Sequence, residues 1–182
     1  NMTIIRLFLL CIVAIGFVYL PAMLGFAKIT APETSRGSII KGSDGKPVGS
    51  RLVAQGFIRP EYFHPRPSAV DYNAKGAAGS NLSPTNPKLT ERAAEITETY
   101  SATAENPIPA DLVTASGSGL DPDISLAGAI YQIPRVAAAR NLPPEKIRAV
   151  IDHIKRPLMG KLGGPELLNV LELNLALDRN FR

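Results

Sequence analysis

Residues with the chemistry of metal ligands or catalytic bases are scarce in this chain. It has one cysteine, Cys11, and two histidines, His64 and His153, which lie far apart in the sequence. Zinc sites of familiar type need several cysteine or histidine ligands at short, regular spacings. The sequence therefore predicts no metal site, and a lone histidine such as His64 is more often a packing or surface residue than a base.

Two serines in the stretch TASGSGLDPDIS are the candidate nucleophiles. Neither Ser116 nor Ser118 has a glycine two positions before it, so the Gly-x-Ser-x-Gly elbow that exposes a hydrolase serine is missing. Asp121 and Asp123 in the same stretch lack the long ligand series of a calcium-binding EF-hand loop. We favour a loop that caps the next helix. A membrane-tethered hydrolase that uses Ser116, Ser118 or His64 stays as an alternative.

Nucleotide-binding signals are weak. No Gly-x-x-x-x-Gly-Lys-Ser/Thr motif occurs, and the stretch MGKLGG lacks both the first glycine and the hydroxyl residue of that motif. In the turn GAAGSNL, backbone N–H groups of Gly79, Ser80 and Asn81 could face a phosphate, as small-residue concavities do. Such turns are common, so we favour a turn that only redirects the chain.

The longest uniform feature is the uncharged apolar run LFLLCIVAIGFVYLPAMLGFA, residues 7–27. As a helix it would be about 31 Å long, which matches the hydrocarbon thickness of a bilayer. We therefore predict a transmembrane helix at 7–27, kinked at Pro21, a defect that a neighbouring helix can compensate. Cleavage of a signal peptide after Ala27 is the alternative, and it would release a free binding module.

The remaining chain predicts a short connector at 28–36 and one soluble α+β domain at 37–182. Because Cys11 falls inside the apolar run, the domain has no thiol and can form no disulfide. The formal net charge is +4, but basic and acidic residues are interspersed and tryptophan is absent, so we expect no nucleic-acid binding.

Helix signals recur in the second half of the domain. We expect one helix from the Asn86-Pro87 cap to Tyr100, with Asn106-Pro107 as its stop. Two further helices are predicted, and all three should bury one face: Ser125 caps Leu126–Gln132, which Pro134 kinks or restarts into Arg135–Arg140, and Pro143-Pro144 open a helix with the stripe Ile147, Val150, Ile151 and Ile154.

Strand and loop signals complete the domain. A hairpin is predicted from strands 38–41 and 51–55 around Asp44-Gly45. The alternating leucines of NVLELNLALD, residues 169–178, predict a strand, with a helix through Leu168, Leu171 and Leu175 as the alternative. Prolines and glycines at 63–87 predict a long ordered loop, and its part 63–82 is our candidate for contact with another molecule.

Six segments in order resemble one known family: GSRLVAQGF, YFHPRPSA, GSNLSPTNPKL, ASGSGLDPDIS, AIYQIPRVAAARNL and NVLELNLALD, behind a single span. This is the family of C subunits (KdpC) of Kdp-type potassium-transporting P-type ATPases, and the resemblance covers residues 7–181. It implies a heterotetrameric inner-membrane complex that hydrolyses ATP to import potassium. The implied partners are a channel-like potassium-binding subunit, a P-type ATPase subunit and a small stabilising subunit.

The resemblance also implies a single-pass topology with a cytoplasmic N-terminus and an extracytoplasmic domain. The role it implies is accessory, since the chain has neither an Asp-Lys-Thr-Gly phosphorylation motif nor a Thr-Val-Gly-Tyr-Gly-like filter. Two such roles are attached to the family, assembly of the complex and an increase in the ATP affinity of the ATPase subunit.

The second role is tied to a Ser-Gly-Gly-Ser turn likened to an ABC-transporter signature. The matching stretch here is AAGSN, residues 77–81, in which alanines replace the first serine and glycine and only Gly79, Ser80 and Asn81 remain as nucleotide contacts. An extracytoplasmic domain would also meet little ATP. We therefore favour the assembly role and expect no firm cofactor, with ATP reaching the complex through the ATPase subunit.

Overall fold

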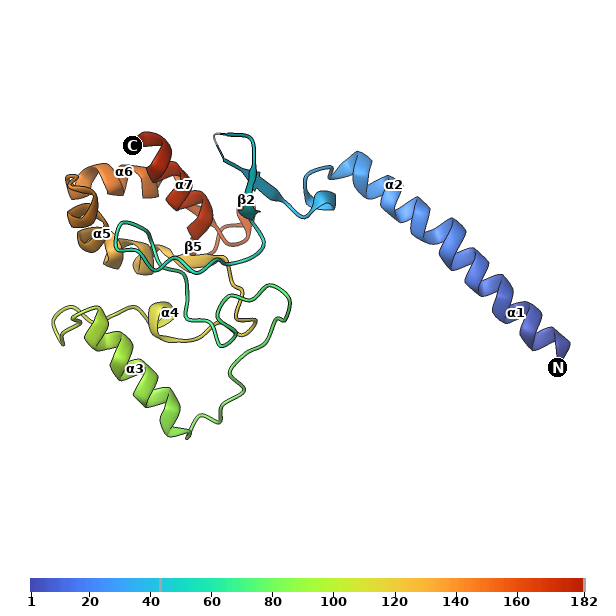
Figure 1. Cartoon of the computed structure of the whole chain (residues 1–182), viewed down its shortest axis with the longest axis horizontal. Helices are drawn as coiled ribbons and strands as arrows, with labels where there is room; N and C mark the ends of the chain where they lie inside the picture. Colours follow the sequence, from blue (N-terminus) through green and yellow to red (C-terminus); the bar gives the residue numbers. More distant parts are fainter. Residues whose placement is uncertain (43, 182) are drawn as a thin grey trace. The chain divides into compact units, whose positions relative to one another are not determined.

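The computed structural model describes residues 1–42 and 44–181 and divides the chain into two units, 1–40 and 41–182 (Figure 1). The first unit is a helix built from α1 (Met2–Val13), a π-helical stretch η1 (Ala14–Tyr19) and α2 (Leu20–Thr30), followed by the short 3₁₀ helix η2 (Thr34–Arg36). Met2–Thr30 form 29 continuous helical residues, with a mean hydropathy of 2.6 in their most apolar window. This confirms an N-terminal helix that is long and apolar enough to cross a membrane.

The kink at Pro21 stays a prediction, but the helix changes just before this residue, in the π-helical stretch η1. Pro21 stands in the first turn of α2, and the amide of Leu20 donates to the carbonyl of Ile15, five residues earlier. Proline has no N–H for the carbonyl four residues before it, so a local widening of the helix is one way to accommodate the ring.

A two-stranded hairpin of β1 (Ile39–Lys41) and β2 (Pro47–Ser50) follows η2 in the chain. The first predicted strand is confirmed, but the prediction of the second at 51–55 is wrong, because the chain turns there. The amide of Gly42 donates to the carbonyl of Lys46 and closes the loop between the strands. The second strand therefore begins at Pro47 instead of at 51. The Ser50 hydroxyl accepts from the amide of Leu52 and ends the strand with a side-chain-bonded turn.

A three-stranded antiparallel sheet in the order β3-β5-β4 lies at the centre of the domain. Its strands are β3 (Asp123–Ser125), β4 (Arg156–Pro157) and β5 (Glu166–Asn169). In this register Ile124 opposes Leu168 and Pro157 opposes Glu166. The helices are α3 (Pro87–Thr99), α4 (Ala110–Val113), α5 (Leu126–Arg140), α6 (Pro144–Ile154) and α7 (Val170–Asn180).

The helix starts predicted from capping residues are confirmed. Asn86 and Ser125 accept hydrogen bonds from the amides of Lys88 and Gly128, at the starts of α3 and α5. Pro134 stands inside α5 without interrupting it, so the alternative of a restart there is wrong. Helix α3 ends at Thr99, earlier than the predicted stop. The prediction that it buries one face is wrong, because its inner face is only half-buried next to α4 (Figure 1).

The strand predicted at 169–178 is wrong, because these residues form α7. Asn169 accepts from the amide of Glu172 and caps the helix. Its buried residues are Val170, Leu171, Leu173, Asn174 and Leu177, which follow helical spacing. The four alternating leucines fit a broad helical face as well as a strand, and the cap together with burial on a period of 3.6 favours the helix.

The hydrophobic core lies between α5, α6, α7 and β5. Its fully buried large side chains include Phe63 from the long loop, Ile124 from β3, Ile147 and Ile151 from α6, and Leu168, Leu173 and Leu177 from β5 and α7. The predicted stripe on α6 is confirmed, with Ile154 partly buried. The core therefore places one face of α5 and α7 directly against the loop that contains Phe63.

Candidate functional site

The loop segment 59–66 is held against the core by side-chain amides. The amide nitrogen of Phe63 donates to Asn174 Oδ1 over 2.8 Å, and Asn174 Nδ2 donates back to the Phe63 carbonyl over 3.0 Å. Both residues are at most 1% exposed. Asn174 thus pairs with the backbone as a neighbouring strand would, and it leaves no polar backbone group of Phe63 unsatisfied in the core.

Gln132 of α5 makes the same kind of pair with the next residue. Its Oε1 accepts from the amide of His64 over 2.8 Å, and its Nε2 donates to the His64 carbonyl over 3.1 Å. Gln132 is fully buried. Two amides from two helices therefore satisfy the backbone of consecutive residues in a segment that belongs to no sheet.

Two arginines of α5 bind the preceding carbonyls. Arg135 Nη1 donates to the carbonyls of Pro60 and Tyr62 at 2.7 and 2.9 Å. Arg140 donates from Nε to the Glu61 carbonyl, and its Nη2 forms a 2.7 Å ion pair with Asp178 of α7. These charge-assisted bonds join α5, α7 and the loop into one rigid body.

His64 lies between this segment and α3. Its Nε2 is 3.2 Å from the Arg59 carbonyl and its Nδ1 is 3.2 Å from the Tyr100 hydroxyl. Because a carbonyl only accepts, Nε2 carries the proton and Nδ1 accepts from Tyr100. Desolvation by burial, and secondarily the charge of Arg135, lowers the pKa of His64 to about 4. The imidazole is therefore neutral at ordinary pH.

This geometry does not assemble the serine hydrolase that His64, Ser116 and Ser118 could suggest. Both ring nitrogens of His64 are occupied by Tyr100 and Arg59, whereas a catalytic base must face its serine. Ser116 is buried, and its Oγ lies 3.3 Å from Ser118 Oγ and accepts from the amide of Asp121. The serines therefore shape their own turn. This agrees with the structural loop that we favour for the stretch TASGSGLDPDIS.

The two glycine-rich turns singled out in the sequence lie against each other, and we call residues 76–82 and 116–120 the double turn. A Cβ on Gly79 would come within 2.8 Å of the Gly117 carbonyl oxygen, and one on Gly119 within 2.8 Å of the Ala78 carbonyl oxygen. Such distances exclude a side chain without a backbone shift. Glycine is thus required here for close approach of two backbones.

Ser68 holds the double turn to the rest of the loop. Its Oγ donates to the Gly119 carbonyl over 2.7 Å and accepts from the amides of Val70 and Tyr72. The amide of Ser116, at the start of the segment 116–120, donates to the carbonyl of the neighbouring Pro67 over 2.9 Å. The two turns are therefore one structural unit.

The three candidate nucleotide contacts lie in the first segment of the double turn, residues 76–82. Gly79 and Ser80 are half-buried and Asn81 is exposed, with a left-handed φ of 51°. Within the described residues 1–42 and 44–181, their amides have no backbone or side-chain acceptor. The segment is open to a partner or ligand, while Gly79 also has the packing role described above.

The acidic residues of the same region are paired with arginines. Asp121 forms a 2.9 Å ion pair with Arg66, and Asp123 binds Arg156 at 2.8 and 2.9 Å. Among the residues that the structure describes, no group of three or more histidine, cysteine, aspartate or glutamate side chains could hold a metal ion. The carboxylates therefore contribute to stability of the loops.

The family model described as K+-transporting ATPase, c chain (KdpC) matches residues 2–179. The chain belongs to the KdpC family. This confirms the resemblance drawn from the six segments, and membership makes the chain one subunit, a c chain, of a potassium-transporting ATPase.

Curated relatives agree over most of the chain. A potassium-transporting ATPase KdpC subunit of Parvibaculum lavamentivorans is 53% identical over 163 residues, which cover 88% of this chain and 86% of the relative. Those of Caulobacter vibrioides and Serratia proteamaculans are 48% and 46% identical, over 93% and 97% of this chain and 87% and 95% of theirs.

For this KdpC family member, the predicted contact loop 63–82 divides into two parts. Phe63 and His64 are internal, whereas 73–78 is exposed and continues into the double turn. Sequence reasoning missed the residues that hold the loop, namely Gln132, Arg135, Arg140 and Asn174. A usable signal existed, because polar residues recur on the inner faces of α5 and α7, where periodicity calls for apolar ones.

Proposed function

We propose that this KdpC family member is a non-catalytic accessory subunit that assembles and stabilises an ATP-driven, high-affinity potassium import pump. The observation that carries the proposal is the helix Met2–Thr30, of which no residue in the most apolar window is buried by the chain itself. Its apolar surface needs lipid or other membrane helices to cover it. The π-helical stretch η1 just before Pro21 favours a neighbouring helix, since a proline inside a span is tolerated where neighbouring helices satisfy the backbone groups that it frees.

The proposal includes an orientation and a set of partners. The N-terminus is cytoplasmic, the helix crosses the inner membrane once, and the domain lies outside the cytoplasm. The helix packs beside the channel-like and ATPase subunits together with the small stabilising subunit, and the domain lies over the channel-like subunit. Loops fixed on a rigid scaffold are suited to such contacts, and the double turn supplies an exposed one.

We prefer the assembly role to an increase in the ATP affinity of the ATPase subunit. The nucleotide role depends on Gly79, Ser80 and Asn81, and the contact of Gly79 with Gly117 explains that glycine without a ligand. No basic side chain is within the stretch 76–82, so a phosphate would meet backbone amides only.

The test uses the intact complex expressed with three forms of this chain. The wild type is compared with a form in which residues 2–30 are replaced by an unrelated single span with the same orientation. A third form lacks the span altogether. We expect the unrelated span to keep the domain on its proper side but to lose copurification with the pump subunits and potassium-stimulated ATP hydrolysis.

Undiminished copurification of the form without a span would contradict the proposal. So would full potassium-stimulated hydrolysis in a complex prepared without this chain, because an assembly subunit must be needed for the assembled activity.

A further inference from the structure

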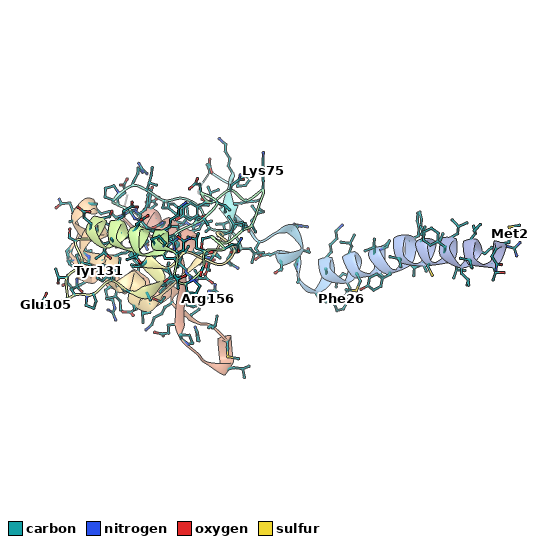
Figure 2. All side chains as sticks on the ribbon, turned by 90° about the horizontal axis from the view of Figure 1, so that it is seen from below. Met2, Phe26, Lys75, Glu105, Tyr131 and Arg156 are labelled. Atoms are coloured by element: carbon teal, nitrogen blue, oxygen red, sulfur yellow. The ribbon has the colours of Figure 1, made fainter. Side chains whose placement is uncertain are left out.

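The hairpin between β4 and β5, residues 156–166, exposes a cluster of large apolar side chains to which the proposed function assigns no role. Leu158, Met159 and Leu162 are 57, 60 and 84% exposed. In the domain 41–182, the other exposed large apolar side chains among the described residues are Val48, Leu52 and Ile58, at 38, 55 and 87%, and they lie outside the hairpin. Figure 2 shows the hairpin projecting from the body of the domain beside the labelled Arg156.

The hairpin is built to hold this apolar end in one shape. The amide of Leu158 donates to the Pro165 carbonyl over 2.9 Å, and that of Met159 to the Gly163 carbonyl over 3.0 Å. Gly160 and Gly163 adopt left-handed φ angles of 55° and 87°, which close the end through the 3₁₀ helix η3 (Gly160–Leu162). A preformed apolar end loses little conformational entropy when it binds.

The base of the hairpin is fixed by ion pairs that also neutralise its cations. Lys155 lies 3.2 Å from Glu166 and 3.4 Å from Asp152, and Arg156 binds Asp123 at 2.8 Å. Residues 157–165 contain no acidic residue and one basic residue, Lys161. Stable attachment to an anionic lipid surface calls for a polybasic cluster besides apolar insertion, and here Lys155 and Arg156 are already paired with carboxylates.

We propose that residues 158–162 form an apolar knob that docks into an apolar pocket on the extracytoplasmic face of another subunit of the same pump. This inference rests on the proposed function, which supplies the partner. Three side chains are too few for a whole interface, so the knob acts as a central contact of the kind that dominates binding energy. Methionine suits such a contact, because its flexible thioether adapts to an irregular pocket. The covalent link to the helix raises the effective concentration of the knob near the subunits that the helix binds.

The test compares two double variants in the intact complex. Leu158→Ser/Leu162→Ser removes the knob, and Leu52→Ser/Ile58→Ser is the matched control, since its residues are 55 and 87% exposed outside the hairpin. After detergent extraction, we expect the knob variant to copurify with a tagged pump subunit about tenfold less than wild type, and the control within about twofold. Equal melting temperatures of the purified full-length chains establish that both variants are folded.

The outcomes distinguish a failure of the proposed function from a failure of the knob proposal. Loss of copurification already in the wild type contradicts the proposed function, whereas a knob variant that copurifies like the control overturns the knob alone. A second experiment labels Cys11→Ser/Leu162→Cys with an environment-sensitive, photo-crosslinking probe. We expect a blue shift and a crosslink to a pump subunit in the complex. The same blue shift for the chain alone in vesicles with anionic lipid would assign the knob to the bilayer and overturn the inference.

Discussion

Asn174 satisfies both polar backbone groups of Phe63 inside the core, and this double role makes it sensitive to truncation. In Asn174→Ala the N–H and the carbonyl of Phe63 stay buried without partners. We expect the free energy of unfolding to fall by about 2–6 kcal/mol, since each of the two orphaned groups costs about 1–3 kcal/mol. Denaturant titration of the full-length chain in detergent measures this. Asn180→Ala, an exposed position on the same helix, should cost under about 0.5 kcal/mol, and equal losses for the two would refute the role of Asn174.

His64 makes stability depend on pH. Its pKa is about 4 in the folded chain and about 6.5 in the unfolded chain, so the unfolded state binds more protons between these values. The stabilisation is complete above pH 6.5 and is lost as the pH falls toward 4. Because the ring is partly exposed, we expect a loss of about 1–2 kcal/mol rather than the full value.

The measurement compares the wild type with His64→Gln at pH 7 and pH 4.5. The variant cannot gain the proton, so its stability should fall by about 1 kcal/mol less than that of the wild type over this interval. Parallel losses in the two chains would show that other groups cause the acid sensitivity.

These residues also show which contacts can be predicted from the sequence alone. It supports the helix caps at Asn86 and Ser125, because capping is local chemistry between residues two or three positions apart. It does not lead to the pairing of Asn174 with Phe63, 111 positions away, because a polar residue on the inner face of a helix does not indicate which distant backbone it binds.

At the scale of elements, α7 illustrates the same limit. The leucine alternation of residues 169–178 supports a strand or a helix, and the outcome depends on burial against α5 and α6, which is a tertiary effect. The α6 stripe had no such ambiguity, because its apolar residues recur at spacings of three and four and Pro144 marks its start.

The double turn gives the element-scale prediction. Gly79→Ala places a methyl group 2.8 Å from the Gly117 carbonyl oxygen, which is backbone and cannot rotate away. We expect a destabilisation of about 1–3 kcal/mol, as for other forced close contacts. Gly76→Ala is the matched control, because a Cβ there meets nothing within 4 Å. Thermal unfolding of the two full-length variants distinguishes them, and equal melting temperatures would mean that Gly79 is free of a packing role.

The molecule as a whole joins an apolar helix to a domain whose interior polar groups are largely satisfied. The side chains of His64, Ser116 and Asp121 are held in structural pairs, so the distinctive surfaces of the described residues are the helix, the double turn and the hairpin knob. Surfaces of this kind suit a subunit that contacts other chains, which agrees with membership of the KdpC family.

The proposed function requires that the N-terminal helix is not cleaved from the domain. We expect the mature chain from membranes to retain the helix Met2–Thr30 by mass spectrometry and to resist alkaline carbonate extraction, because the apolar helix matches a bilayer in length. Ala14→Arg/Val18→Arg should release a substantial fraction of the chain, since each arginine near the middle of a span costs about 2.5–3.5 kcal/mol. Thr3→Arg/Thr30→Arg, near the helix ends where arginine can reach the interface, should leave retention unchanged. A soluble chain that lacks residues 1–27 by mass spectrometry would instead establish a cleaved signal peptide, and both the assembly role and the tethered knob would then lose their physical basis.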